Sequence, residues 1–471
     1  MKSSLKQYAL TVCSSALILM GCSKNFIVEN PNDSVPATQA LNTESGLQDA
    51  LNGAYAGLRA VSLYGRDFPV IGDLQADNTY VETKNSGRYL PQYNYSVVSS
   101  DAVVGEMWNQ AYIDILRVNN IIDANVTGPN VAAIKAQAYA IRGLLYFKLV
   151  NIYAKPYTVD STSLGVPIIL HFNPNLFPAR NKVSEVYSQI ISDLKMAVAS
   201  APAYSTSVRM SKYAAEGLLA RAYLYMGDYA DAKSAAVDVI NNSTFTLVTP
   251  NNYAAFWQNP AARTDAVETM FEVDCDAINN NGFDDLGGIY YNGYNDIYCS
   301  SQLYNLYSPT DVRRGLLVPG TTKSGSPAYI VTKFPNAQNT DRDNLKVIRL
   351  AEVYLIAAEA SLPTNQTDAL YYLNALLAQR DPLAVPYAVT GPLLLQAIVT
   401  ERRKELAFEG DRLYDMNRLQ LSINRVANPG AIPAGPNNIN LSIPYPDNRR
   451  VAPIPQQELT ANPNIVQNPG Y

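Results

Sequence analysis

The sequence predicts a mainly α-helical fold, in which a tetratricopeptide-like helical-repeat scaffold carries a loop-rich lobe. Apolar residues recur every three or four positions through long stretches, as they do along one face of an amphipathic helix. One stretch has the helix–turn–helix pattern of a repeat unit, and the middle of the chain lacks helical periodicity. With 471 residues, the chain can bury a large core.

Three long helices are predicted first, at 44–61, 106–126 and 131–154. Each range holds apolar residues at helical spacing over several turns, so each helix has a face to bury. Together these helices should form one side of the core.

The range 214–240 predicts two helices joined by a tight turn. An apolar helix reaches Leu224, Gly227 and Asp228 interrupt it, and a second helix begins at Tyr229. Glycine permits the turn, and small alanines on both helices allow a close approach. Two further pairs have a similar pattern, so three pairs could stack into a solenoid: 349–360 with 367–380, and 131–154 with 183–199.

Residues 241–344 form the predicted loop-rich lobe. Asn, Gly, Pro and Tyr replace the helical pattern here, and strand-like runs are as short as 328–334. Long loops on a rigid scaffold are where binding groups usually lie. Proline-rich sequence predicts an extended segment at 421–471, which leaves about 41–240 and 345–420 for the helical repeats.

The first residues predict export and a lipid anchor. Two lysines precede an apolar run from about residue 8 to residue 20, which is typical of a secretory signal. The alternative, a membrane-spanning helix, needs about 20 apolar residues, and this run is shorter and interrupted by polar ones. The ending "LMGC" resembles a lipobox, so we expect removal of residues 1–21, acylation of Cys22 and a polar tether over 22–40.

Two cysteines remain for the folded part of the chain, Cys275 and Cys299. In an oxidising compartment they could pair and close a loop of about 25 residues, which the chain-entropy model values at roughly 3 kcal/mol. The alternative is two separate buried thiols. The sequence leaves both alternatives open.

Composition disfavours several classes of function. With 41 acidic and 36 basic residues the net charge is −5, and without a basic stripe no nucleic-acid partner is expected. The single histidine, His171, removes most histidine-based triads and metal sites, and the common nucleotide-binding and hydrolase motifs are absent. We therefore predict no catalytic residue. Hydrolysis by paired carboxylates needs no histidine, so a glycosidase stays open as an alternative.

Carboxylates and amides cluster in "VDCDAINNNGFDD" (273–285). A hard cation such as calcium could use these oxygens, but Ile278 breaks the spacing of an EF-hand loop. A solvated turn is the favoured interpretation, so no metal and no cofactor are predicted, with calcium as the alternative.

Tyrosine is the favoured aromatic residue, with 33 in the chain against 2 tryptophans. A sugar ring offers an apolar C–H face to an aromatic ring and hydroxyls to polar groups. In "GGIYYNGYNDIY" (287–298) no helix face needs filling, so we predict ligand contacts for Tyr290, Tyr291 and Tyr294. The alternative, that these rings fill the core, is the interpretation preferred for tyrosines on predicted helices.

Three segments resemble one known family. They are "VIRLAEVYLIAAEA" (347–360) and "IVTERRKELAFEGDRLYDMNRL" (398–419), which are similar to helices of that family, and the ending "PIPQQELTANPNIVQNPGY" (453–471). In this order behind a lipobox, they resemble the SusD/RagB outer-membrane lipoproteins, which work with TonB-dependent transporters in glycan uptake.

This resemblance implies a single SusD-like domain over 41–471, built as an α-α superhelix, that is lipid-anchored at the outer membrane and faces the cell exterior. It implies capture of oligosaccharide, without catalysis, and delivery to a SusC-like TonB-dependent transporter. The alternative within binding proteins is a peptide-capturing lid on a peptide transporter. The family's glycan site uses early loops and the central lobe, and the matching early segment is 71–95, with Asp73, Asn78, Tyr80, Arg88, Tyr89 and Tyr93.

The charged residues of the 398–419 motif are predicted to be structural. On helices, charges three and four positions apart form stripes, and buried ion networks commonly specify a fold. A set of catalytic carboxylates is the less favoured alternative. We expect an ion network at helix junctions that includes Arg402, Arg403, Glu405, Glu409 and Arg412.

Overall fold

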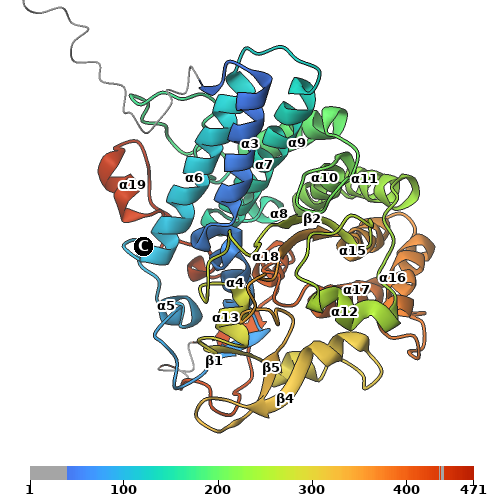
Figure 1. Cartoon of the computed structure of the whole chain (residues 1–471). Coiled ribbons are helices and arrows are strands. Elements are labelled where there is room, and N and C mark those ends of the chain that lie inside the picture. The colour runs from blue at the N-terminus through green and yellow to red at the C-terminus, as the bar shows by residue number, and fades with distance from the viewer. Residues whose placement is uncertain (1–39, 434, 436–439) are drawn as a thin grey trace, which may run out of the picture.

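The structure is a computed structural model that describes residues 40–433, 435 and 440–471. Helices fill most of the molecule, and Figure 1 shows some of the short strands at one end of it and one, β2 (Thr269–Val273), near its middle. The predicted signal, Cys22 and all but the last residue of the predicted tether lie outside the described residues. Within those residues, no helix is long and apolar enough to span a bilayer.

The three long helices predicted at the start of the chain are present. They are α3 (Glu44–Leu58), α6 (Ala102–Asp123) and α7 (Val131–Tyr153), and they pack against one another. The side chains of Thr43 and Asp101 accept hydrogen bonds from backbone N–H groups in the first turns of α3 and α6. Helix α7 is buried almost all round, because α3, α6 and α9 (Val183–Ser200) all contact it.

The predicted helix pair at 214–240 is confirmed as α10 (Lys212–Met226) and α11 (Tyr229–Asn242). Gly227 ends α10 with a φ of 75°, a left-handed conformation that glycine adopts without steric cost. The carboxylate of Asp228 accepts a hydrogen bond from the N–H of Asp231 at 3.2 Å and so begins α11. The turn chemistry identified in the sequence therefore sets the hairpin.

The second predicted pair is also confirmed, as α15 (Leu350–Ser361) and α16 (Gln366–Arg380). Helix α11 packs on α15, so the repeat units form a continuous stack in which α7 contacts α9 and α9 contacts α10 (Figure 1). Helix α17 (Gly391–Glu405) covers α15.

The segment 398–419, predicted to be a helix, forms two. Helix α17 ends at Glu405 and α18 (Arg412–Arg418) begins after a turn in which Gly410 has a φ of 89°. A Cβ at Gly410 would lie 2.4 Å from the Cα of Pro69, so only glycine permits this approach to α4 (Asp67–Leu74). The helical break brings the end of α17 and the start of α18 together, where Arg403 and Arg412 both bind Asp77.

The loop-rich lobe contains short strands and single-turn helices. Strands β1 (Thr79–Val81), β3 (Ile297–Cys299), β5 (Pro327–Val331) and β4 (Leu317–Thr321) form an antiparallel sheet in that order. Two-stranded antiparallel sheets pair β2 (Thr269–Val273) with β6 (Leu345–Arg349), and β7 (Ile423–Asn424) with β8 (Ser442–Ile443). The short α-helices of the lobe are α12 (Tyr253–Gln258), α13 (Leu286–Tyr290) and α14 (Ser301–Tyr304). Outside the lobe lie α5 (Leu90–Tyr93), α8 (Tyr157–Asp160) and α19 (Gln456–Ala461).

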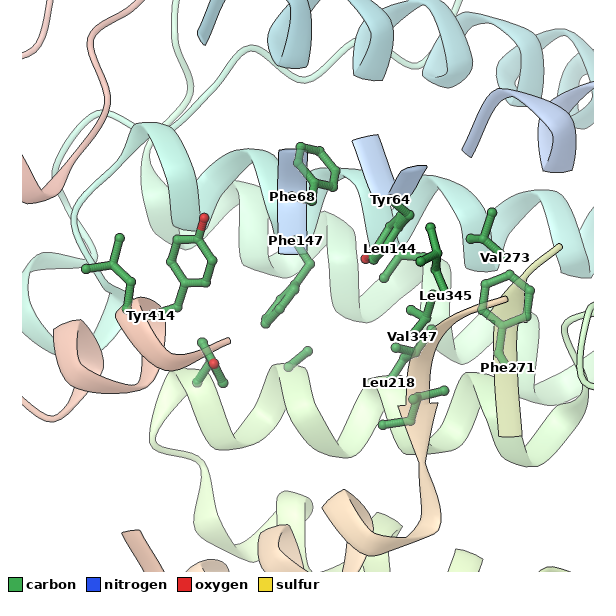
Figure 2. Packing of buried hydrophobic residues seen from close by; sticks show 14 of the residues in the cluster. Tyr64, Phe68, Leu144, Phe147, Leu218, Phe271, Val273, Leu345, Val347 and Tyr414 are labelled. Carbon is green, nitrogen blue, oxygen red and sulfur yellow. The ribbon is translucent and has the colours of Figure 1, made fainter. Parts of the chain in front are cut away.

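One hydrophobic core joins the helical stack to the strands. Figure 2 shows Phe147 of α7 and Leu218 of α10 among residues of β2, β6 and the first helices. The ring centroids of Phe147 and Tyr225 lie 5.0 Å apart, with the rings edge to face. Such packing holds the lobe against a rigid scaffold.

The predicted ion network is confirmed, and its largest part surrounds Glu405. The Glu405 carboxylate accepts hydrogen bonds from three guanidinium groups, at 2.8 Å from Arg349, 2.9 Å from Arg380 and 3.1 Å from Arg313. We call the connected set the Glu405 cluster: its five cations are Arg313, Lys333, Arg349, Arg380 and Lys404, and its five anions are Glu268, Asp311, Glu401, Glu405 and Glu409. Equal numbers of opposite charges make its burial possible.

The other predicted network members occupy two neighbouring clusters. Arg402 binds Asp415 at 2.7 Å and Glu352 at 3.0 Å, and Arg403 and Arg412 both bind Asp77. All of these side chains are buried. The motif therefore performs a structural task.

The structure places Cys275 and Cys299 as separate buried thiols, so the disulfide alternative is wrong for this structure. The Cys299 thiol donates to the carbonyl oxygen of Ser300 at 3.3 Å, and burial raises the pKa of both thiols. We expect an alkylating reagent to leave both unmodified in native mature protein and to modify both after denaturation without reductant. Mass spectrometry checks this, and two unmodified cysteines in the denatured protein would establish a disulfide instead.

Candidate ligand-binding surface

Six of the nine side chains predicted to bind ligand are buried, and two of them belong to the ion-network region. Asn78 donates to Asp73 at 2.6 Å, and Arg403 donates to Asn78 at 2.9 Å. The N–H of Gly410 donates to Asp73 at 2.7 Å, and burial raises the pKa of this carboxyl to about 6. Asp73 and Asn78 thus fasten α4 to the turn before α18, and the prediction of ligand contact is wrong for both.

Three tyrosines of the early segment are also in the core. Tyr80 stacks on Tyr298 with ring centroids 5.8 Å apart, on neighbouring strands β1 and β3. Tyr89 donates its hydroxyl to the carboxylate of Asp67, and Tyr93 lies against the guanidinium of Arg425. Each is at most 3% exposed, so these rings cannot reach a ligand.

Tyr290 is the sixth buried side chain, so the prediction of ligand contact is wrong for it too. It is completely buried at the end of α13, stacked on Phe334 and edge to face with Phe408. The Asp285 carboxylate begins this helix by accepting from the N–H of Gly288 at 2.6 Å. The short helix gives Tyr290 an inward direction that the Gly-rich sequence did not reveal.

The chain leaves α13 after Tyr290, and the next two tyrosines, Tyr291 and Tyr294, are partly exposed. Arg88, from the loop between β1 and α5, lies over the ring of Tyr294, with 3.6 Å between its Cζ and the ring centroid. This cation–π contact fixes the ring while leaving the guanidinium partly exposed. The structure thus brings Arg88 and Tyr294 together from segments about two hundred residues apart, with Tyr291 beside Tyr294 in the chain.

Polar groups lie around this contact, and a further aromatic residue is next to one of them in the chain. Asp284 lies 3.6 Å from Arg88 and 2.6 Å from Arg66, and Phe283 is 45% exposed next to it. Lys323 donates to the carbonyl oxygen of Tyr294 at 2.6 Å, and Gln338 donates to that of Asn292 at 2.5 Å. We call this set the Tyr294 surface: Arg88, Phe283, Asp284, Tyr291, Tyr294, Lys323 and Gln338.

Phe283, Lys323 and Gln338 were not predicted from the sequence. Phe283 could have been identified from the sequence. It stands among Asn, Gly and Asp without helical or strand periodicity, so no helix or strand face needs this ring for packing. Lys323 and Gln338 carry none, because only folding brings them to Tyr294 and Asn292. The charges near this surface also act on the neighbouring Arg66. Burial alone would lower the pKa of its guanidinium, but Tyr89, Asp67 and Asp284 raise that pKa.

The oxygen-rich segment 273–285 forms a turn beside this surface. The Asp276 carboxylate accepts from the N–H groups of Ile278 and Asn279, each at 2.7 Å, and from the Asn279 side chain. Across residues 40–433, 435 and 440–471, no group of three or more His, Cys, Asp or Glu side chains could hold a metal ion. The one histidine, His171, is exposed and lies 2.8 Å from Asp123.

One hollow lies near these elements, and a larger one lies away from them. A polar groove of about 240 Å³ at the base of the 273–285 segment is lined by Tyr55, Arg59, Arg209, Glu272 and Asp274, among others. A cavity of about 710 Å³ lies elsewhere, between the 155–164 segment and the C-terminal segment. None of the nine predicted ligand residues lines either hollow.

A partly exposed aromatic ring edged by charged and amide groups is chemically suited to bind a sugar. The apolar C–H face of a pyranose can lie on a tyrosine ring, while guanidinium, carboxylate and amide groups exchange hydrogen bonds with its hydroxyls. The Tyr294 surface supplies each of these groups.

Comparisons with known proteins find one family along the chain. A family model described as "Starch-binding associating with outer membrane" matches residues 25–224, and a SusD family model matches residues 326–471. SusD-like protein P2 of Formosa agariphila is 30% identical over 99% of this chain and 100% of its own length.

Solved structures agree. A SusD superfamily protein of Bacteroides thetaiotaomicron has a TM-score of 0.84 and 31% identity, covering 91% of this chain and 100% of that one. A protein of Bacteroides vulgatus named for sugar binding has a TM-score of 0.82 and 30% identity, covering 92% and 99%. The same family is found in both halves of the sequence and along almost its entire length: this chain belongs to the SusD/RagB family.

Proposed function

We propose that this protein captures oligosaccharide on the Tyr294 surface and delivers it, without catalysis, to a SusC-like TonB-dependent transporter. The observation that carries the proposal is the Arg88–Tyr294 contact, which holds an aromatic ring in place near Asp284 and on the same short segment as Tyr291. A ring that is already fixed loses little side-chain entropy when a sugar stacks on it. The starch-binding description of the family model and the name of the Bacteroides vulgatus relative support a glycan as the ligand.

The anchor belongs to the same proposal. The lipobox-like ending at Cys22 and the family model's association with an outer membrane support an acylated N-terminus at that membrane. We further propose that the domain lies on the exterior side. A barrel beneath an anchored binding domain would receive ligand at high local concentration.

The test is calorimetric titration of the protein with a panel of oligosaccharides and peptides. We expect one glycan class to bind and Tyr294→Ala to weaken that binding by about tenfold or more, because stacking is lost. Arg88→Lys should also weaken it, since an ammonium keeps the charge but not the guanidinium contact with the ring. Tyr371→Ala is the matched control: Tyr371 is 67% exposed on α16, away from the Tyr294 surface.

Each other outcome has a definite meaning. Unchanged glycan affinity in Tyr294→Ala would place the site elsewhere. Binding of peptides alone would favour a peptide-capturing lid, and release of shorter sugars would favour a glycosidase. Failure to co-purify with a TonB-dependent barrel would contradict the delivery step while leaving the capture step intact.

A further inference from the structure

An exposed apolar loop lies between α8 and α9. Phe172 is 62% exposed, Leu176 48% and Phe177 53%, although the core buries most large apolar side chains of the described chain. Val466, which is 60% exposed, lies next to the base of this loop because Arg180 donates to its carbonyl oxygen at 3.0 Å. A local group of exposed apolar side chains indicates an interaction surface. We call these four residues the Phe172 patch.

Hydrogen bonds hold the loop in place on both sides of its tip. Before the tip, Asn119 donates to the carbonyl oxygen of Ile169 at 2.8 Å, and His171 contacts Asp123. After the tip, Asn464 donates to the carbonyl oxygen of Phe177 at 2.7 Å, and Asn462 donates to that of Pro178 at 2.8 Å. The backbone is thus fixed while the apolar side chains remain exposed to solvent.

The loop lies at the end of the molecule where the described chain begins. His171 contacts the last residue of α6, and α7 starts at this same end, where Asn130 binds Glu44 of the first turn of α3. Figure 1 shows the loop above α19, beside the start of α3. Seventeen residues separate Cys22 from Ala40, and even a fully extended chain of that length spans at most roughly 60 Å.

We propose that the Phe172 patch inserts into the surface of the lipid bilayer next to the acylated N-terminus. This inference rests on the proposed anchorage at Cys22, which limits how far this end of the helices can lie from the membrane. Phenylalanine and leucine side chains bind at the interface of headgroups and acyl chains. The chain has no Asp or Glu from Ser161 to Lys182, so no carboxylate of the loop opposes anionic headgroups. Two contacts, the acyl chains and the patch, would fix the orientation of the domain on the membrane.

The test uses the mature acylated protein in vesicles of phosphatidylethanolamine and phosphatidylglycerol, with Phe172→Trp and Phe177→Trp as reporters. The native tryptophans, Trp108 and Trp257, are each 2% exposed, so they provide a constant background. We expect the emission of each introduced tryptophan to shift to the blue and to be quenched by lipids brominated on the acyl chains. Tyr371→Trp, on α16, is the matched control and should show neither effect.

The outcomes separate the inference from the anchorage. If wild-type protein floats with the vesicles but neither Phe172→Trp nor Phe177→Trp is quenched, the anchorage stands and the membrane contact is wrong. If the wild type does not float, the anchorage fails and the inference fails with it. If quenching is absent and Phe172→Ser with Phe177→Ser abolishes co-purification of the barrel, the patch binds the transporter, which also overturns the inference.

Discussion

Glu405→Gln is expected to lower the free energy of unfolding by about 3–5 kcal/mol, which is the usual cost of removing one partner of a buried ion pair. The Glu405 side chain is completely buried and balances Arg313, Arg349 and Arg380. Glutamine keeps the size of the side chain but supplies no negative charge, so three buried guanidinium groups lose their shared anion. Urea unfolding followed by circular dichroism measures the change.

A surface ion pair provides the matched control. Lys233 and Asp368 lie 2.7 Å apart, but their side chains are 27% and 38% exposed. Water and salt screen such a pair, so Asp368→Asn should cost less than about 1 kcal/mol. A loss of that small size in Glu405→Gln would show that the Glu405 cluster is not important for stability.

The pH dependence of this loss follows from the pKa of Glu405. Burial alone would raise the pKa of the Glu405 carboxyl. Arg380, Arg349 and Arg313 outweigh this effect and hold the pKa well below its ordinary value. Its contribution to stability is therefore fully present above the unfolded-state pKa of about 4.3 and decreases as pH falls through the lower folded-state pKa. Wild type and Glu405→Gln should differ most near neutral pH and converge in acid.

The Glu405 cluster also explains how a loop-rich lobe can present a defined surface. Its members come from the helical stack, as do Arg380 and Glu405, and from the lobe, as do Glu268, Arg313 and Lys333. Charges that must neutralise one another in a dry interior allow few alternative arrangements. The cluster thus fixes the lobe, and with it the Tyr294 surface, on the repeat scaffold.

The helical stack could be predicted from the sequence because its signals are local. Apolar periodicity marks α3, α6 and α7, and Gly227 with Asp228 marks the α10–α11 turn within a few residues. The charged motif 398–419 predicts buried ion pairs, and the structure confirms them. Its partners could not be named, because Glu268 and Arg313 lie about a hundred residues away in the chain.

The candidate site was predicted less well, for a physical reason. In a short segment without a long period, sequence does not tell which ring points inward, and Tyr290 and Tyr291 differ by one position. Asp73 and Asn78 have polar side chains typical of sugar sites, but folding brings Gly410 and Arg403 against them. Polar residues near a loop can therefore form buried hydrogen bonds in the core instead of binding a ligand.

Tyr290→Ala is expected to destabilise the protein by about 3–5 kcal/mol, as is usual when a large buried aromatic ring is removed. Tyr290 is completely buried between Phe334 and Phe408, and nothing nearby is expected to fill the cavity. Its hydroxyl has no hydrogen-bond partner within the described part of the chain, so Tyr290→Phe should change stability by less than about 1 kcal/mol. Thermal and urea unfolding measure both variants.

Comparison with Tyr294→Ala separates the two roles that tyrosine has in one short segment. Tyr294 is partly exposed beneath Arg88, so its removal should change stability little and glycan affinity by about tenfold or more. Tyr290→Phe should leave both quantities unchanged, because it keeps the ring that packs the core. Weaker glycan binding in stably folded Tyr290→Phe would contradict this division, since it would mean that the buried hydroxyl reaches the ligand. If instead only Tyr294→Ala loses affinity, the exposed ring binds the sugar and the buried ring supports it.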